Sequence, residues 1–308
     1  MNSLGLTLGK FAPLHKGHEY LIRTALEEND EVVIVVYDAP ETTHIPLNVR
    51  ADWIRRLFPS AEVIEGWDGP PDSGDSPEVM RVQENYILRL LKGRNVTRFY
   101  SSEFYGAHMS RALGAIDRRV DPPRQVVPVS GTAIRANPYA HRGFLSPEVY
   151  RDLITNIVFL GAPSTGKSTL ARALADHYHT AYMPEYGRDY WLEHQVDRRL
   201  SLEQLLEIAE GHLQREEELL LQSDRFLFTD TNTLTTRLFS LYYHGKAHPK
   251  LETLADQAAR RYDLVFVCLP DIPYEDTWDR SGEAYRISFQ KQIVADLRRS
   301  EERRVGKE

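Results

Sequence analysis

Short apolar runs alternate with longer amphipathic segments along the first half of the chain. Residues 4–8, 32–37, 62–64 and 98–101 are typical of strands, and residues 18–29, 49–58 and 77–91 between them have helical spacing. Strands that alternate with helices predict a mainly parallel sheet with helices on both faces. The polar Gly/Pro-rich stretch 66–77 predicts a loop.

A second alternation of strands and helices begins near Thr155. Residues 156–160, 181–183, 226–229 and 264–269 predict strands, and residues 201–222 predict a long amphipathic helix. Ser201 and Gln204 fit a capping box at its start, and we expect its acidic run 216–218 on a solvated face. The polar, Pro- and Gly-containing stretch 138–152 predicts a boundary between two domains, 1–145 and 152–298.

The composition narrows the class of protein. The chain of 308 residues has a net charge of −7 and is 42% hydrophobic and 27% charged, which is ordinary for a globular protein. An acidic balance argues against a non-specific nucleic-acid surface, so no nucleic-acid partner is expected. No apolar run is long enough to span a bilayer and no leader is visible, which predicts a cytoplasmic protein. The single cysteine, Cys268, is expected to be a buried structural thiol.

The first candidate site is the decapeptide GKFAPLHKGH at 9–18, between the first predicted strand and helix. Unpaired N–H groups at such a helix start favour phosphate. His15 and His18 bracket a glycine and could face the same phosphate oxygens. The other candidate phosphate-binding residues of this stretch are Gly9, Lys10, Phe11 and Lys16. Alone, the pair could equally be surface or capping histidines.

A resemblance strengthens this interpretation. The decapeptide resembles the GxFxPxHxGH signature of the nucleotidyltransferase superfamily, and SGTAIR at 130–135 resembles the superfamily's distal SxTxxR segment. This implies a Rossmann-like domain in which an acceptor phosphate attacks the α-phosphorus of ATP and pyrophosphate leaves. His15, His18 and Arg135 would then hold the triphosphate, helped by Ser130, Thr132 and Mg²⁺.

The second candidate site is GAPSTGKS at 161–168, which matches the P-loop pattern between a predicted strand and a helix. Lys167 would reach the β- and γ-phosphates of ATP, and Ser168 would bind magnesium. The remaining phosphate-binding candidates are Gly161, Ser164, Thr165, Gly166 and Thr169. A nucleotide sensor without catalysis is the alternative for this motif alone.

Further polar residues favour a kinase. Glu185 follows a predicted strand and could accept the proton of a substrate hydroxyl, with Arg188 near the substrate. Asp230 ends another strand and suits a magnesium ligand, or the base if Glu185 is not. Arg280 and Arg286 are expected to close as a lid over the transferred phosphoryl group, although either could form a surface ion pair.

The order of the two motifs resembles the NadR-type bifunctional family. Supporting stretches are PLNVRADWI at 46–54, SSEFYG at 101–106, VDPPRQVVPVSGTAIR at 120–135, EYGRDY at 185–190 and DTNTLTT at 230–236. The resemblance implies that a P-loop kinase phosphorylates nicotinamide riboside at its 5′-hydroxyl, and that the first domain joins nicotinamide mononucleotide to AMP, making NAD. It also places Arg50 and Trp53 near the first site as substrate residues.

The chain departs from that family's pattern at both ends. The first predicted strand starts at Leu4, so we expect no helix-turn-helix domain and no operator binding. The last ten residues, 299–308, resemble a translated sequencing adapter and are expected to be a non-native tail. Two other readings stay open: a different adenylyl- or cytidylyltransferase fused to a small-molecule kinase, and a nucleotide-sensing regulator. A homo-oligomer is compatible with the sequence.

Overall fold

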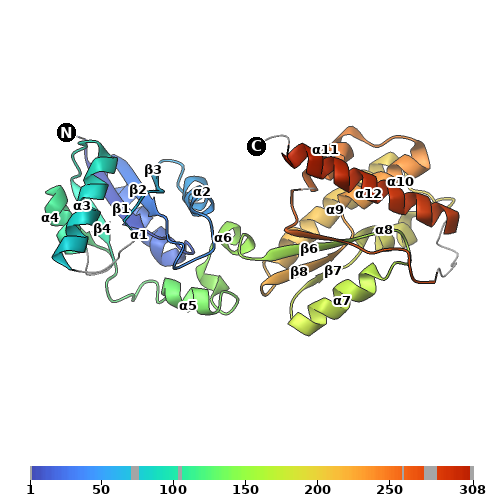
Figure 1. Ribbon diagram of the computed structural model, residues 1–308, viewed down its shortest axis with the longest axis horizontal. Helices are drawn as coiled ribbons and strands as arrows, with labels where there is room; N and C mark the ends of the chain where they lie inside the picture. Colours follow the sequence, from blue (N-terminus) through green and yellow to red (C-terminus); the bar gives the residue numbers. More distant parts are fainter. Residues whose placement is uncertain (1, 71–75, 103–105, 259, 274–282, 306–308) are drawn as a thin grey trace. The chain divides into compact units, whose positions relative to one another are not determined.

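The chain forms two compact units, Met1–Tyr150 and Arg151–Glu308 (Figure 1). The structure, a computed structural model, describes residues 2–70, 76–102, 106–258, 260–273 and 283–305. Both units are α/β with parallel strands, which confirms the predicted fold class. No helix within these described ranges combines the length and apolar character that a membrane span needs.

The first unit is built around a five-stranded parallel sheet with the order β3-β2-β1-β4-β5. Its strands are β1 (Leu4–Gly9), β2 (Glu31–Tyr37), β3 (Glu62–Gly66), β4 (Arg98–Ser101) and β5 (Ile116–Arg119). Its helices are α1 (Lys16–Glu28), α2 (Leu47–Leu57), α3 (Pro77–Leu91), α4 (Gly106–Leu113), α5 (Gly131–Ala136), the 3-10 turn η1 (Arg142–Phe144) and α6 (Pro147–Arg151).

The strand order of this sheet fixes where a ligand can bind. The chain runs from β1 outward through β2 and β3, then returns to place β4 on the other side of β1. Such a reversal leaves a crevice at the carboxyl ends of the two strands where the order turns. Leu6 of β1 lies opposite Val33 and Phe99, and these side chains pack with α3 and α4, whereas α1 packs against β1, β2 and β4.

The second unit has a four-stranded parallel sheet with the order β7-β8-β6-β9. Its strands are β6 (Thr155–Leu160), β7 (Tyr182–Met183), β8 (Phe226–Asp230) and β9 (Leu264–Val267). Its helices are α7 (Lys167–Tyr178), α8 (Tyr186–His194), α9 (Leu202–Leu220), α10 (Thr233–His244), α11 (Pro249–Ala258) and α12 (Glu283–Val305). The capping box predicted from Ser201 and Gln204 is present at the start of α9.

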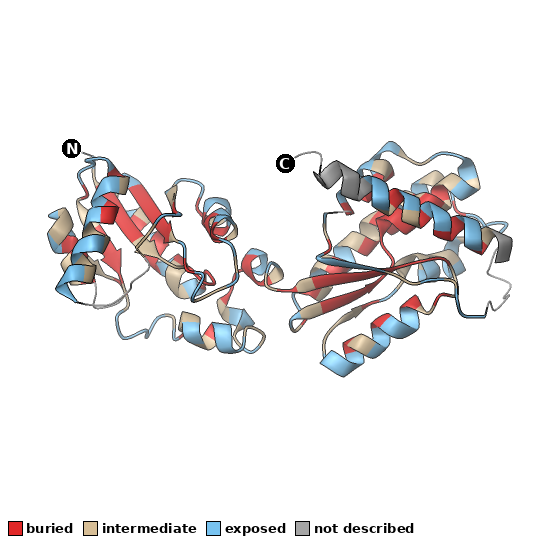
Figure 2. Cartoon of the chain, viewed as in Figure 1, coloured by how far each residue is buried: buried red, intermediate tan, exposed pale blue. Residues whose placement is uncertain are grey.

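Alternation along β6 divides the core of the second unit into two layers. Ile157 and Phe159 pack against α7, whereas Val158 and Leu160 pack against α10, α11 and α12. Figure 2 shows buried residues along the strands and on the inward sides of the helices. Both faces of the sheet are therefore packed against helices, and the P-loop follows the carboxyl end of β6.

Two expectations for this unit are wrong. Leu264, Val265 and Phe266 of β9 are 39–49% exposed, and Cys268 is only half-buried, because β9 is an edge strand of the sheet. Glu216 does not lie on a solvated face: it is 0% exposed. Its carboxylate is buried because Asn156, Arg261 and Tyr262 donate hydrogen bonds to it. Amphipathic spacing along α9 could not reveal those donors, which come from other elements.

Candidate active sites

The first site is built on the turn between β1 and α1, at the crevice of the first sheet. His15 is the N-cap of α1, and its Nδ1 accepts the backbone N–H groups of Gly17 and His18 at 3.2 and 3.4 Å. The Nδ1 of His18 accepts the backbone N–H of His15 in return, at 3.4 Å. A Cβ on Gly17 would lie 3.1 Å from the His15 ring, so a larger residue would push against the capping side chain.

This capping arrangement fixes the tautomer of both histidines. Because each Nδ1 accepts a hydrogen bond, each neutral imidazole carries its proton on Nε2. Burial, together with the positive charges of Arg124 and Arg135, lowers the pKa of His15 to about 4. Burial and the neighbouring His15 lower the pKa of His18 well below its usual value. Both rings are therefore neutral near pH 7 and offer Nε2–H groups as donors.

The two predicted motifs of the first unit meet in space. Arg135, at the end of SGTAIR, donates from Nη1 to the carbonyl of Ala12 at 2.7 Å and from Nη2 to Thr132 at 3.1 Å. A Cβ on Gly131 would lie 3.9 Å from His15 Nε2, so the second motif faces the histidines. Ser130 caps α5 through the N–H of Ala133. Segments more than a hundred residues apart thus form one polar surface.

A cavity of about 1150 Å³ opens over this surface. Of the residues that the sequence singled out, it is lined by Gly9, Lys10, Phe11, His15, His18, Ser130, Thr132 and Arg135. Arg124, which the sequence analysis did not single out, also lines it. Lys10 pairs with Glu41 at 2.6 Å at the edge of the cavity. Lys16 is turned away and donates to the carbonyl of Gly143 at 2.7 Å.

Arg50 and Trp53 are 0% exposed, and neither lines the cavity. Their expected role as substrate residues stays a prediction. Arg50 donates to three backbone carbonyls, those of Ile45, Lys10 and Tyr37. Its guanidinium also lies 3.5 Å from the Asp38 carboxylate. Arg50 therefore ties the phosphate-binding turn to the ends of β2 and α2, and Trp53 is a core residue.

The second site is the P-loop between β6 and α7. The backbone of Gly161 has φ 151°, and a Cβ there would lie 2.5 Å from the carbonyl oxygen of Cys268, so glycine is required. Gln290 of α12 accepts the N–H of Ala162 at 2.8 Å and donates to the carbonyl of Cys268 at 3.2 Å. These bonds tie the start of the P-loop to α12 and to the segment that follows β9.

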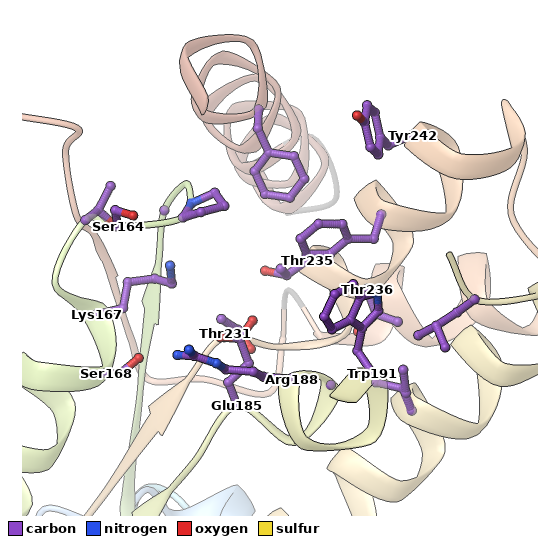
Figure 3. A pocket seen from close by; sticks show the side chains of 18 of the residues that line it. Ser164, Lys167, Ser168, Glu185, Arg188, Trp191, Thr231, Thr235, Thr236 and Tyr242 are labelled. Carbon is purple, nitrogen blue, oxygen red and sulfur yellow. The ribbon is translucent and has the colours of Figure 1, made fainter. Parts of the chain in front are cut away.

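Lys167 and Glu185 both line the cavity beside this loop (Figure 3). Lys167 Nζ donates to the carbonyl of Ala162 at 3.0 Å. Burial, and then the charge of Asp230, raise the pKa of Glu185 to about 7, although Lys167 opposes them. Asp230 is 1% exposed, and burial also raises its pKa. Its Oδ1 has no hydrogen-bond partner among the described residues. The geometry thus brings a phosphate-binding cation beside two acids.

A cavity of about 850 Å³ runs from the P-loop to an aromatic end. Of the residues predicted from the sequence, it is lined by Gly161, Ser164, Thr165, Gly166, Lys167, Ser168, Thr169, Glu185 and Arg188. Its far end is lined by aromatic side chains, Trp191, Phe239, Tyr242, Tyr243 and Phe289. The sequence analysis missed this wall because its members come from α8, α10 and α12. His212 of α9, also missed, lines the cavity as well.

Of the two arginines expected to form a lid, the structure describes Arg286. Arg286 lies in α12, is 2% exposed, and donates from Nη2 to the carbonyls of Ser164 and Ile272 at 2.9 and 3.0 Å. Arg286 thus supports the backbone of the P-loop in this structure. The lid role expected for it stays a prediction. Arg280 lies outside the described residues.

These features define a protein with two nucleotide-binding sites, one at a nucleotidyltransferase turn and one at a P-loop. Residues 6–137 match the cytidylyltransferase-like family, and residues 156–305 match an AAA domain family. The chain is 30% identical to the trifunctional NAD biosynthesis/regulator protein NadR of Escherichia coli over 320 residues, 96% of this chain and 76% of that protein. The Salmonella typhimurium protein of the same name is also 30% identical, over 96% of this chain and 76% of its own length.

The chain belongs to the NadR family. The crystal structure of a NadR protein in complex with NAD and AMP-PNP has the same fold, with a TM-score of 0.53, 23% identity and coverage of 97% of this chain and 88% of that one. A NadR protein in complex with NR gives a TM-score of 0.52 at 24% identity and covers 97% of this chain and 86% of that one.

Proposed function

We propose that the first unit transfers AMP from ATP to nicotinamide mononucleotide, giving NAD and pyrophosphate, and that the second unit makes that mononucleotide from nicotinamide riboside and ATP. The observation that carries this proposal is the presence of two separately built phosphate sites in one NadR-family chain. The NadR relatives are described as NAD biosynthesis proteins, and solved NadR proteins bind NAD, AMP-PNP and NR.

Adenylyl transfer at the first site needs alignment and charge stabilisation rather than a covalent nucleophile. The mononucleotide phosphate attacks the α-phosphorus of ATP, and negative charge grows on the phosphate oxygens. His15 and His18 donate from Nε2 to those oxygens, because capping occupies each Nδ1. Arg135 adds a fixed positive charge, with Thr132 bonded to it. Arg50 keeps the turn in place through the Lys10 carbonyl.

Phosphoryl transfer at the second site uses the acids and Lys167. Glu185 accepts the proton of the 5′-hydroxyl as that oxygen attacks the γ-phosphorus. A base with a pKa of about 7 suits this step near neutral pH, because about half of it is deprotonated and it still takes up a proton readily. Lys167 and the P-loop N–H groups hold the β- and γ-phosphates. Arg188 lines the same cavity and balances the charge of Glu185.

The aromatic end of the second cavity favours a flat, positively charged base. Phe239 and Phe289 lie 5.1 Å apart between ring centroids, and Tyr242 and Tyr285 lie 4.0 Å apart. Aromatic faces attract a cation such as the pyridinium ring of nicotinamide riboside. A neutral purine or pyrimidine would gain stacking but not this electrostatic attraction. The wall therefore supports the riboside over other small-molecule alcohols.

Magnesium fits the second site. Asp230 Oδ1 is buried without a partner among the described residues, and Ser168 is close enough to lower the pKa of Asp230. Asp230 and Ser168 would hold magnesium there, and the ion would neutralise charge on the phosphates. No group of three His, Cys, Asp or Glu side chains converges in the part of the chain that the structure describes, so the nucleotide phosphates would supply most of its ligands.

The test is to incubate the purified chain with Mg-ATP and nicotinamide mononucleotide, and to assay NAD and pyrophosphate. Nicotinamide riboside is run in parallel, and the mononucleotide is measured. Formation of both products supports the proposal. A folded protein that binds ATP but forms no NAD would favour another acceptor or a nucleotide-sensing role. The same assays with EDTA in excess over magnesium should abolish both reactions. We also propose that the chain forms a homo-oligomer. Light scattering of the purified protein tests this.

A further inference from the structure

Helix α9 forms one long side of the kinase cavity. Leu205, Ile208 and His212 all line that cavity and are spaced three and four residues apart, so they share one face of the helix. Leu205 and Ile208 belong to the cluster that contains Trp191 and Tyr190, at the aromatic end. His212, one turn further along, is close enough to Asp230 to affect its pKa. Along α9, His212 thus lies between the base-binding end and the acids.

His212 is held from behind by a buried carboxylate. Its side chain is 4% exposed, and its Nε2 lies 3.4 Å from Glu216 Oε2. Glu216 is fixed by Tyr262, whose hydroxyl donates at 2.7 Å, and by Asn156, whose Nδ2 donates at 2.8 Å. Although burial alone would raise the pKa of Glu216, His212 and Arg261 lower it to about 2. The carboxylate therefore stays charged, with one oxygen 3.4 Å from Nε2 of His212.

This anchoring leaves Nδ1 of His212 for another partner. Among the described residues the His212 ring makes one polar contact, that of Nε2 with Glu216, and buried Nε2 forms no hydrogen bond. A buried polar residue that lines a cavity and is held at one nitrogen commonly serves a ligand with the other. A riboside bound with its base at the aromatic end and its 5′-hydroxyl at Glu185 would place its sugar between them, beside His212.

We propose that His212, positioned by Glu216, binds a secondary hydroxyl (2′ or 3′) of the riboside in the kinase cavity. This inference rests on the proposed kinase function. The bond would select ribosides over deoxyribosides, because a site built around a hydroxyl is left with an unpaired polar group when that hydroxyl is missing.

The experiment compares nicotinamide riboside with its 2′-deoxy and 3′-deoxy analogues in the wild-type chain and in His212→Leu. The wild type should have a kcat/KM about tenfold lower for one of the two analogues than for the riboside. In His212→Leu that difference should vanish, since the riboside falls to the level of the analogue. The KM for ATP should not change. If His212 had a merely structural role, His212→Leu would lower kcat/KM for all three substrates by the same factor.

Three further variants keep the result interpretable. His212→Gln, which can still hydrogen-bond, should retain part of the discrimination, and it replaces His212→Leu if that variant does not fold. Glu216→Gln should weaken discrimination, whereas Glu218→Gln, at an exposed position on the same helix, should not. Unchanged discrimination in folded His212→Leu or His212→Gln overturns the inference while leaving the kinase function intact. A wild type that neither binds nor phosphorylates the riboside overturns both.

Discussion

The imidazole rings of His15 and His18 lie face to face, with centroids 3.6 Å apart and planes inclined by 21°. Two protonated rings could not stack so closely without strong repulsion, so the geometry belongs to the neutral pair. The same neutrality follows from the cap, since a protonated Nδ1 could not accept the backbone N–H groups of α1. The first site is therefore built for the uncharged state of both histidines.

Acid should consequently destabilise the first unit. The folded-state pKa of His15 is about 4, below its usual 6.5. The unfolded chain therefore takes up the proton first as the pH falls, and stability is lost between pH 6.5 and about 4 by up to about 3 kcal/mol. Hydrogen exchange of the α1 amides in the ligand-free protein measures this loss.

His15→Asn is the matched variant, because asparagine also caps helices but does not titrate. It should lose less stability than the wild type over that pH range. His44→Asn, at an exposed position of the same unit, is the control and should behave as the wild type. An identical pH dependence in His15→Asn and the wild type would show that the cap does not depend on a neutral His15.

The two activities should separate by mutation. Lys167→Ala should abolish riboside phosphorylation and leave NAD formation from the mononucleotide, because Lys167 lies in the P-loop cavity alone. His18→Ala should do the reverse, lowering adenylyl transfer by about 10²-fold or more. Both products are quantified in the same preparation, and circular dichroism checks folding. Loss of both activities in either folded variant contradicts the assignment of one reaction to each cavity.

Glu185→Gln should abolish kinase activity and raise the stability of the second unit. The folded-state pKa of Glu185, about 7, lies above its ordinary 4.5. The folded protein therefore holds the proton more tightly, and its stability falls as the pH rises from 4.5 through 7. Glutamine carries no such charge. In nucleotide-free protein the variant should melt at a higher temperature than the wild type at pH 8, with a smaller difference at pH 5, and it should lack kinase activity.

Glu193→Gln, at an exposed position of α8, is the control and should leave both the melting temperature and the kinase unchanged. A lower melting temperature for Glu185→Gln at pH 8 would mean that the ionised carboxylate stabilises the unit. Asp230 would then become the better candidate for the base.

Arg50→Lys should weaken the first unit and its reaction together. Lysine cannot reach the carbonyls of Ile45, Lys10 and Tyr37 at once, so buried acceptors lose their donors. We expect a loss of about 2–4 kcal/mol in the free energy of unfolding. Adenylyl transfer should fall in kcat more than in KM, because the turn loses its alignment. Denaturant unfolding and steady-state kinetics measure both.

Arg56→Lys, on the exposed side of the same helix, should change neither quantity measurably. If Arg50→Lys instead raised the KM for the mononucleotide at unchanged stability, Arg50 would be a substrate residue after all.

Most of the features that could be predicted from the sequence belong to local motifs. The glycines and histidines at 9–18 and the P-loop at 161–168 act through nearby backbone, so their geometry follows from the strand–turn–helix context. The alternation of apolar runs also predicted both parallel sheets. These features depend on neighbours along the chain, which a single sequence displays.

Contacts between distant segments could not be predicted from the sequence. Arg286 resembles a lid arginine in sequence, but Gln290 and Arg286 of α12 lie behind the P-loop and hold it. Arg50 is charged and adjacent to the site, yet it is buried and donates hydrogen bonds to three carbonyls from separate segments. Glu216 sits in an acidic run, but its donors lie on β6 and after α11. In each case the decisive contacts join segments far apart in the chain.

The buried carboxylate of Glu216 also determines which helices around the kinase cavity can accept substitutions during evolution. Helix α9 cannot slide or rotate against the sheet without separating Glu216 from Asn156, and that would strand a charge in the core. The face of α9 that carries Leu205, Ile208 and His212 is therefore held in register with β6. Other parts of the cavity wall are formed by aromatic residues on α8 and α10. New substrate preferences should arise by substitution on those helices, with α9 as the fixed reference.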